Sequence, residues 1–318
     1  MSSIEVRPFR RHDRYQLTDL VNAHAAAVVP GASVSVAAML SHLERDPGEF
    51  IVDPWVTERA TLVAEQNNRV AAAAHLLRYG DDDAVGPAYR GGGEVRWLVF
   101  WPEGPRSSNP WWTAGTHAAA ELIDACIAQF EQWSVSSQSA GGELPVLGVY
   151  GVPEQWPHIS ALYEQAGFAH NGHTELVYLA RVGDLPRLPV PPVAGLELAR
   201  SVGLNGTRLS AIQDGEVIGY IEVEIRDEGE RLARQAGWAD VGNLHVSEDF
   251  RRRKIGTWLL GHAADWLELA RVDRLLDYTY SEGGDATGLT HENYRAFLAA
   301  LPFRLLTSTR RGWTRTTI

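Results

Sequence analysis

The stretch Leu244–Leu260, LHVSEDFRRRKIGTWLL, decides the fold of this chain. Its pattern predicts a short strand at Gly242–Val246, a polar turn at Ser247–Lys254 and a helix at Gly256–Ala270. The helix carries apolar side chains at one-turn spacing on one face, as an amphipathic helix requires. A strand, a basic turn and a helix therefore follow one another within about thirty residues.

The positive charge of the turn lies where the helix begins. The first N–H groups of a helix have no intrahelical acceptor, and the helix dipole is positive there. Arg251, Arg252, Arg253 and Lys254 add cationic side chains at the same place. This combination predicts an anion site, and in particular a phosphate site. The alternative is a solvated basic turn before an ordinary helix.

This stretch resembles motif A of the GCN5-related N-acetyltransferases (GNAT), which reads roughly strand, Arg/Gln-x-x-Gly-x-Gly/Ala, helix. Here the pattern is Arg251-x-x-Lys254-x-Gly256, so Lys254 replaces the first glycine. Its backbone amide can still donate a hydrogen bond. The resemblance implies that acetyl-CoA binds as a co-substrate, and that the motif strand splays from its neighbour at a bulge. The residues implied to bind it are Leu244, His245, Val246, Arg251, Arg252, Arg253, Lys254, Ile255, Gly256, Thr257 and Asn293.

Composition narrows the class of protein. The 318 residues, with a formal net charge of -11, favour two soluble domains and argue against a nucleic-acid partner. The single cysteine, Cys126, excludes an intrachain disulfide framework and a multi-cysteine zinc site, and we expect no metal. No apolar run has the length of a signal-peptide core or a membrane span, so we expect a cytoplasmic protein without a membrane partner.

Two related units are expected. Leu62–Leu77 and Leu209–Glu224 each read as a hairpin, the second with an Asp-Gly turn. A strand and then a helix follow each hairpin, and this repeated order indicates an internal duplication. The predicted fold is α+β, with two tandem GNAT-like units, each a mixed, mostly antiparallel sheet flanked by helices.

The proline-rich stretch 184–195 is predicted to be a spacer between the units. The expected domains are a degenerate N-terminal GNAT-like domain at 1–183 and an acetyl-CoA-binding GNAT domain at 196–318. In the N-terminal unit, Gly115 aligns with Gly256, but Pro110 then stands where Arg251 does. We therefore expect the N-terminal unit not to bind the cofactor.

Acetyl transfer to an amine needs a proton acceptor and a proton donor. In the family resembled, a tyrosine in Phe-Tyr-x-x-x-Gly-Phe often serves as the acid. Tyr163 fits this pattern in the N-terminal unit, whereas Leu298 takes the tyrosine position in the C-terminal unit. Tyr294, one helical turn earlier, is the expected replacement. Tyr278 and Tyr280 are weaker candidates for the acid. Glu222, His245 and Asp240 are candidate bases.

The predicted function is an N-acetyltransferase that moves the acetyl group of acetyl-CoA directly to an amine of a small molecule or a peptide. One alternative is a non-catalytic sensor that binds CoA or acyl-CoA, which the leucine at position 298 favours. Another is an antibiotic-modifying acetyltransferase, because an acidic surface attracts a polycationic drug. Either a monomer or a homodimer is compatible with the sequence.

Overall fold

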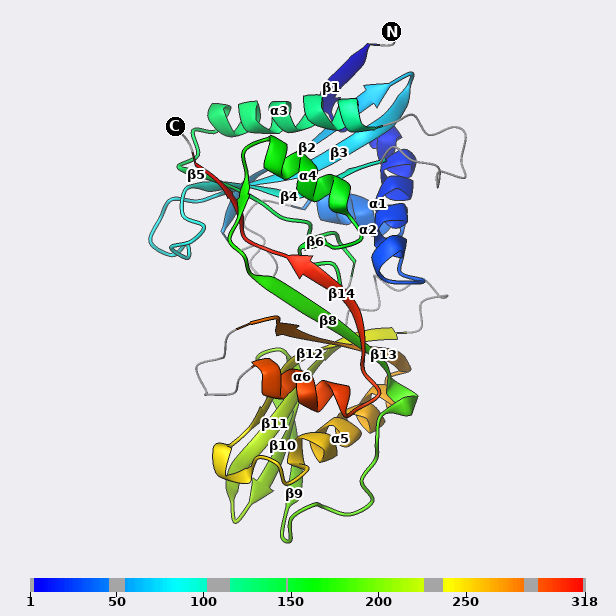
Figure 1. Ribbon diagram of the computed structural model, residues 1–318, viewed down its shortest axis with the longest axis vertical. Helices are drawn as coiled ribbons and strands as arrows, with labels where there is room; N and C mark the ends of the chain where they lie inside the picture. Colours follow the sequence, from blue (N-terminus) through cyan, green and yellow to red (C-terminus); the bar gives the residue numbers. More distant parts are fainter. Residues whose placement is uncertain are drawn as a thin grey trace. The chain divides into compact units, whose positions relative to one another are not determined.

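In the computed structural model, the described residues are 3–45, 55–101, 115–146, 148–225, 237–282 and 291–316. They form an α+β protein with two mixed sheets flanked by helices, as predicted (Figure 1). The chain divides into two compact units: unit 1 is Met1–Thr174 with Ser308–Ile318, and unit 2 is Glu175–Thr307.

Unit 1 contains a sheet in the order β1-β2-β3-β4-β5-β15-β7. Helix α3 packs on β2 and β3, and helices α1 and α2 pack on each other. The strands of this sheet are β1 (Ile4–Pro8), β2 (Val56–Gln66), β3 (Arg69–Tyr79), β4 (Gly92–Phe100), β5 (Ser137–Ala140), β7 (Ala169–His170) and β15 (Trp313–Arg315). Unit 1 also contains β6 (Val152–Pro153), which belongs to the second sheet. The helices are α1 (Arg14–Val28), α2 (Val36–Leu43), α3 (Thr116–Gln132) and α4 (Pro157–Gln165), with a 3-10 turn η1 (Arg11–Asp13).

The second sheet has the order β6-β14-β8-β13-β12-β11-β10-β9. Helix α5 packs on β10, β11, β12 and β13, and α6 packs on β13 (Figure 1). The strands are β8 (Thr174–Arg181), β9 (Glu197–Gly203), β10 (Gly206–Gln213), β11 (Glu216–Ile225), β12 (Gly237–Val246), β13 (Val272–Tyr280) and β14 (Arg304–Arg310). The helices are α5 (Ile255–Leu269) and α6 (His291–Ala299), with 3-10 turns η2 (Val182–Asp184) and η4 (Glu248–Phe250).

Both hairpins expected from the sequence are present. The two-residue turn Asn67-Asn68 has φ angles of 54° and 61°, and Asp214-Gly215 has 52° and 85°. These left-handed pairs match the twist of the strands that they join, which is why Asn, Asp and Gly are favoured there. The same plan recurs downstream, because β4 and β12 each pair with the preceding strand through a bulge and with the following strand in parallel.

Two strands pair with the sheet of the unit that lies farther away in sequence. Strand β8 lies before residue 184, yet it pairs with β13 in unit 2. Strand β15 lies near the C-terminus, yet it pairs with β5 and β7 in unit 1. The observed boundaries therefore differ from the expected 1–183 and 196–318, because strand pairing joins segments that are remote in sequence.

The first residues of the proline-rich stretch 184–195 pack against helix α5. Leu185 is buried in the core of unit 2. A β-carbon on Gly261 of α5 would lie 2.7 Å from the carbonyl oxygen of Pro186, so this helix and the stretch are in close contact. Arg187 adds ion pairs to Asp265 and Glu268 of α5. The expected spacer is thus partly a fixed element of unit 2.

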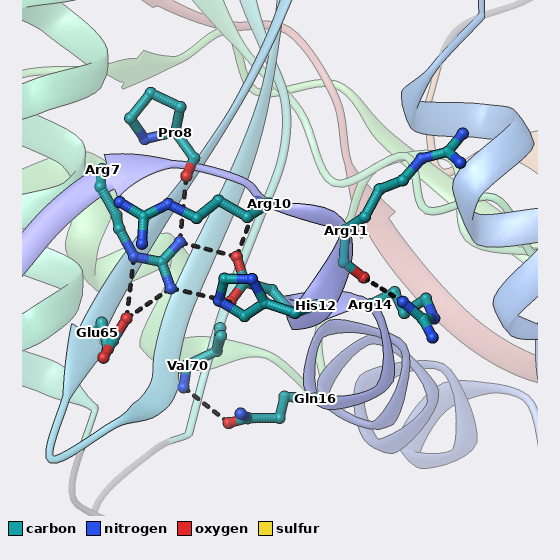
Figure 2. A network of polar contacts seen from close by, with 10 residues as sticks. Arg7, Pro8, Arg10, Arg11, His12, Arg14, Gln16, Glu65 and Val70 are labelled. Carbon is teal, nitrogen blue, oxygen red and sulfur yellow. Dashed lines mark hydrogen bonds and ion pairs between the residues drawn. The ribbon is translucent and has the colours of Figure 1, made fainter.

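A buried ion cluster anchors the start of unit 1 (Figure 2). Arg7 on β1 is 5% exposed and donates hydrogen bonds to both carboxylate oxygens of Asp13, at 2.7 and 2.8 Å. Its Nε donates to Glu65 on β2 at 2.9 Å. Burial raises the pKa of Asp13, but the hydrogen bonds from Arg7 and from the Arg10 amide outweigh it, and the pKa lies below its ordinary value. This cluster joins β1, β2 and the start of α1.

Candidate active site

The end of β12 is free along one edge. Its antiparallel ladder with β11 continues to Val246 and shifts register between Glu222 and Val223, so that Gly242 is the extra residue of a bulge. Its parallel ladder with β13 covers only Gly237–Asp240. Beyond Asp240 the two strands separate, and the backbone edge of β12 that faces β13 has no strand partner among the described residues. The splay implied by the resemblance is present.

The loop before α5 has an unusual backbone. Lys254 is the N-cap of the helix and has φ 63° and ψ 13°, in the left-handed region, and Arg252 has φ 65°. Glycine is the usual residue at such positions, because a β-carbon there costs about 1–2 kcal/mol. The first intrahelical bond runs from the Trp258 amide to the Lys254 carbonyl. Earlier amides of the first turn are therefore available to an anion.

These elements line an opening of about 800 Å³, here called the cofactor cleft. Ten of the eleven expected cofactor-binding residues belong to its lining, together with Tyr294. The full lining is Tyr220, Asn243–Val246, Phe250–Arg252, Lys254–Thr257, Asn293, Tyr294 and Phe297. Three cationic side chains thus border one opening at the start of a helix.

Arg253 is the expected cofactor-binding residue that does not line the cofactor cleft. Its guanidinium carbon is 5.4 Å from the ring centre of Phe250, and it does not line the cleft. Arg251 is instead tied to the end of β12, because its Nε donates to the carbonyl oxygen of Val246 at 3.1 Å. The arginine side chains of this loop therefore point in different directions. The run of consecutive arginines in the sequence does not by itself show this.

Glu222 lies outside the cofactor cleft. It is 1% exposed, and it accepts hydrogen bonds from Arg208 at 2.7 Å and from the amides of Leu204 and Asn205 at 3.2 Å. Burial raises the pKa of this carboxyl, but the hydrogen bonds outweigh it, and the pKa is lowered. Glu222 therefore holds the β9–β10 turn against β11, which removes the reason for expecting it to act as a base.

Tyr294 lines the cofactor cleft and donates a 2.8 Å hydrogen bond to Oδ2 of Asp277 on β13. The other oxygen of Asp277 accepts from the Tyr278 amide at 2.7 Å. Burial, with a smaller contribution from the nearby Asp240 carboxylate, raises the pKa of Asp277 to about 7, although these two hydrogen bonds act to lower it. The sequence analysis missed Asp277; its signal was an acidic residue between the apolar pair Leu275-Leu276 and two tyrosine positions.

A second opening, of about 200 Å³, is here called the side pocket. It shares Asn243, Leu244 and Tyr294 with the cofactor cleft. Its full lining is Glu175, Val241–Leu244, Asp277–Tyr280, His291 and Tyr294. It therefore lies along the separated ends of β12 and β13. His245, the other candidate base, lines the cofactor cleft only and lies 5.6 Å from the Tyr220 ring.

The described residues at the corresponding positions of unit 1 are buried or make contacts within the unit. The end of β4 is buried, with Val99 0% and Phe100 2% exposed, and His158 packs edge-on against Phe100. At the start of α3, the Gly115 amide donates to the carbonyl of Trp101, and a β-carbon on Gly115 would lie 2.9 Å from that oxygen. Tyr163 is fully buried and donates to the Gly141 carbonyl. The expected comparison residue Pro110 lies outside the described residues.

The described residues also bear on membrane insertion and on metal binding. None of the described helices is long and apolar enough to cross a membrane. Within the same residues, no three His, Cys, Asp or Glu side chains are grouped so that they could hold a metal ion.

The sequence model of the Acetyltransferase (GNAT) family matches residues 190–286. These residues include the splayed strand, the basic loop and α5. These residues are therefore similar to the GNAT family. The GNAT match supports acyl transfer as the general class of reaction.

Solved structures extend the likeness to both units. A tandem GNAT protein from the clavulanic acid biosynthesis pathway is 16% identical, with a TM-score of 0.61 and 98% of each chain covered. A GCN5-related N-acetyltransferase from Sphaerobacter thermophilus is 15% identical, with a TM-score of 0.57, 99% of this chain and 97% of that chain covered. At these identities the likeness shows the fold, which is that of a tandem GNAT protein.

A larger protein contains a similar region. The glucosamine N-acetyltransferase region of a fungal multi-domain β-N-acetylglucosaminidase is 14% identical, with a TM-score of 0.62 and 98% of this chain covered. This chain spans 38% of that protein's length. No curated protein matches the chain by sequence.

Proposed function

We propose that the GNAT domain binds acetyl-CoA in the cofactor cleft and transfers the acetyl group directly to an amine. The observation that carries this proposal is the joint placement of a free strand edge, a left-handed N-cap at Lys254 and three cationic side chains around one opening. Acetyl-CoA would supply an acetyl group activated as a thioester, on a diphosphate-bearing carrier.

The residues present fit a diphosphate. Helix-start amides and a left-handed turn form a concave set of donors, which is suited to an anion. Gly256 brings its backbone to the cleft without a side chain, and a β-carbon there would lie 3.5 Å from Phe297 and 3.9 Å from Val246. Arg252 and Lys254 are exposed at the same rim. These features together favour phosphate binding over a merely solvated basic turn.

The free edge of β12 fits an extended arm that carries amides. From Val241 onward, the strand has β11 on one side and, within the described part of the chain, no strand on the other. A pantetheine-like chain can pair with these backbone groups as an added strand would. A backbone N–H at the end of such a strand can also stabilise negative charge on a carbonyl oxygen during acyl transfer.

Unit 1 is proposed not to bind acetyl-CoA. The support is the geometry of its described residues: Gly115 bonds to Trp101 at the helix start, and Val99 and Phe100 are buried at the strand end. A single cofactor site per chain follows from this proposal.

The test is acetyl-CoA binding to the full chain by calorimetry, comparing Arg252→Glu with Arg304→Glu. Both changes alter the net charge equally, but Arg304 is an exposed residue that does not line the cleft. We expect Arg252→Glu to weaken binding by at least about tenfold and Arg304→Glu to leave it within about twofold. Equal effects of the two changes, or no binding by the parent protein, would refute the proposal.

Acetyl transfer separates the enzyme from the sensor alternative. Leucine at position 298 cannot donate a proton, so no acid stands at the usual tyrosine position, and the phenols that line the cleft are Tyr220 and Tyr294. Transfer to amines that is lost in Arg252→Glu together with binding would favour the enzyme. Tight binding without turnover across an amine panel would favour the sensor. An aminoglycoside panel alongside simple amines would address the antibiotic alternative.

A further inference from the structure

The bulge in β12 lies close to the point where this strand leaves β13. Glu222 on β11 is opposite Asn243, and the next residue of β11 is opposite Val241, so Gly242 is the extra residue. The ladder to β13 ends at Asp240, just before this bulge. A bulge bends its strand and increases the local twist. The backbone at Gly242 therefore helps to set the direction of the free strand edge at the cofactor cleft.

The two-residue turn between β9 and β10, Leu204-Asn205, contacts this bulge. The side-chain amide of Asn205 donates to the Gly242 carbonyl oxygen at 3.4 Å and to a carboxylate oxygen of Glu222 at 3.3 Å. A β-carbon added to Gly242 would lie 2.4 Å from the β-carbon of Asn205, which is too close for two side chains. Gly242 does not have a positive φ. The close approach of the turn, rather than a left-handed backbone, therefore requires glycine at the bulge.

Glu222 fixes this turn from beneath. One oxygen of its buried carboxylate accepts from the Leu204 amide at 3.2 Å and from Arg208 Nε at 2.7 Å, and the other accepts from the Asn205 amide at 3.2 Å. A β-carbon on Gly203 would lie 2.4 Å from the first oxygen. The turn cannot shift without leaving a buried carboxylate short of donors, which is costly. We call Leu204, Asn205 and Glu222 the turn clamp.

The turn clamp also borders a wall of the cofactor cleft. The guanidinium carbon of Arg208 lies 4.2 Å from the ring centre of Tyr220. Tyr220 and Asn243 both line the cleft, and the Asn243 side chain donates to the Tyr220 hydroxyl at 3.0 Å. Glu222 and Asn205 do not line the cleft themselves. Their influence on a ligand there must pass through the residues that they hold.

Unit 1 has the same bulge under a different cover. The β3–β4 register shifts between His75 and Leu76, so Arg96 is the extra residue, and His75 is opposite Trp97 as Glu222 is opposite Asn243. Helix α2 contacts this pair: the ring centres of His42 and His75 lie 5.2 Å apart, and Trp97 Nε1 donates to His42 at 3.4 Å. The chain between β1 and β2 forms α1 and α2, whereas only the two-residue turn joins β9 and β10.

We propose that Glu222 and Asn205 are positioning residues for the cofactor. Through the turn clamp they hold the bulge at Gly242, and the bulge aligns the free edge of β12 with the pantetheine arm of acetyl-CoA. The turn clamp takes the place of the helical cover that the same bulge has in unit 1. This inference rests on the function proposed above, and it adds two residues that act on the cofactor only through the backbone of β12.

The proposal distinguishes two parts of the cofactor. The diphosphate is proposed to bind at the loop before α5, whereas the arm is proposed to pair with the edge of β12. The hydrogen bonds of Glu222 and Asn205 connect β10, β11, β12 and the turn. Loss of the turn clamp should therefore weaken binding of the arm and spare the diphosphate. A general loss of folding would weaken both.

The first test reads the bulge without any cofactor. Hydrogen exchange of the full chain, followed by NMR, compares the parent with Asn205→Ala, which keeps the ion pair of Glu222 with Arg208. We expect the amides of 243–246 that bond to β11 to exchange at least about tenfold faster in the variant, and those of α5 to stay within about twofold. Unchanged exchange at 243–246 would overturn the proposal.

The second test compares two ligands by calorimetry. The probes are acetyl-CoA and adenosine 3′-phosphate 5′-diphosphate, which is the nucleotide half of CoA without the arm. We expect Asn205→Ala to weaken acetyl-CoA binding by at least about fivefold and to leave the nucleotide half within about twofold, because only the arm needs an aligned edge. Equal weakening of both ligands, or of neither, would overturn the proposal.

The third test removes the acceptor. In Glu222→Gln an amide group replaces one carboxylate oxygen and faces N–H donors of the turn, so we expect acetyl-CoA to bind at least about tenfold more weakly. Glu224→Gln is the matched control on the same strand, because Glu224 is exposed, and it should stay within about twofold. Equal effects of the two changes would contradict the proposal.

A double variant asks whether the two residues act as one unit. Asn205→Ala combined with Glu222→Gln should bind acetyl-CoA within about twofold of Glu222→Gln alone, because both changes release the same turn. Multiplication of the two separate effects would contradict the shared clamp. Failure of the parent to bind acetyl-CoA would refute the proposed function, and the cofactor role with it. The exchange test reads the bulge independently, so the two failures are distinguishable.

Discussion

A β-carbon added to Gly256 would lie 3.5 Å from the ring of Phe297, which is an ordinary van der Waals contact. The fold therefore has room for a small side chain at the start of α5. The space that a side chain at position 256 would occupy is part of the cofactor cleft. This distinction between folding and binding can be tested at one position.

Gly256→Val should weaken acetyl-CoA binding by at least tenfold, because two methyl groups would occupy space at the helix start where the diphosphate is proposed to bind. Gly256→Ala should have a smaller effect on Kd. We expect Gly256→Ala to leave the free energy of unfolding unchanged or raise it by up to about 1 kcal/mol, since alanine favours helix. Calorimetry and thermal melts check both. A loss of stability that accompanies the loss of binding would contradict this account.

Lys254→Gly should stabilise the protein. Lys254 has a left-handed backbone at the N-cap of α5, and glycine adopts this conformation without the cost of a β-carbon. The expected gain is about 0.5–1 kcal/mol, reduced by the greater freedom of glycine in the unfolded chain. Lys254→Val, which is β-branched, should destabilise. Thermal melts of the three proteins test this, and an order with valine above glycine would show that the left-handed assignment is wrong.

Asp277→Asn should change stability in a pH-dependent way. The pKa of Asp277 is raised from 3.8 to about 7, so the folded state holds more protons than the unfolded state between these values. The stability of the parent therefore falls as pH rises through this window. The asparagine variant lacks this loss, so its stability relative to the parent should rise by up to about 4 kcal/mol between pH 4 and pH 8.

Thermal melts at a series of pH values measure that difference. Asp265→Asn is the matched control, because Asp265 lies on the exposed side of α5 in an ion pair with Arg187 and has no part in the side pocket. A pH dependence of the same size in both variants would contradict the raised pKa of Asp277.

Arg7→Met should destabilise unit 1 strongly. The substitution leaves Asp13 buried without its guanidinium partner, and removal of one member of a buried ion pair costs about 3–5 kcal/mol. Arg11→Met is the matched control, because Arg11 pairs with Glu44 at the surface, and we expect no measurable change there. Denaturant unfolding checks both, and equal effects would refute the structural role of the cluster.

Local features of the fold were predictable from the sequence. The Asp214-Gly215 turn requires left-handed backbone and so marks its hairpin, and the apolar spacing from Gly256 onward predicted α5 to within one residue of its observed start. The basic run marked this helix start as an anion site, and three of its four cationic residues, Arg251, Arg252 and Lys254, line the cleft. These features depend on neighbours in sequence, which is why pattern reasoning finds them.

Non-local features were not predictable in this way. Glu222 was expected to be a candidate base, but Leu204 and Arg208, which are distant in sequence, donate hydrogen bonds to it and help to bury it. Asp277 read as one acidic residue in an apolar strand, and only the parting of β13 from β12 places it beside Tyr294. Likewise, β8 joins β13 by long-range pairing that no local pattern encodes.

Titration of the full chain with acetyl-CoA, monitored by calorimetry, tests the central claim most directly. We predict one binding site per chain, which Gly256→Val weakens by at least tenfold. Two equivalent sites, binding that is insensitive to Gly256→Val, or no heat of binding at all would contradict the account.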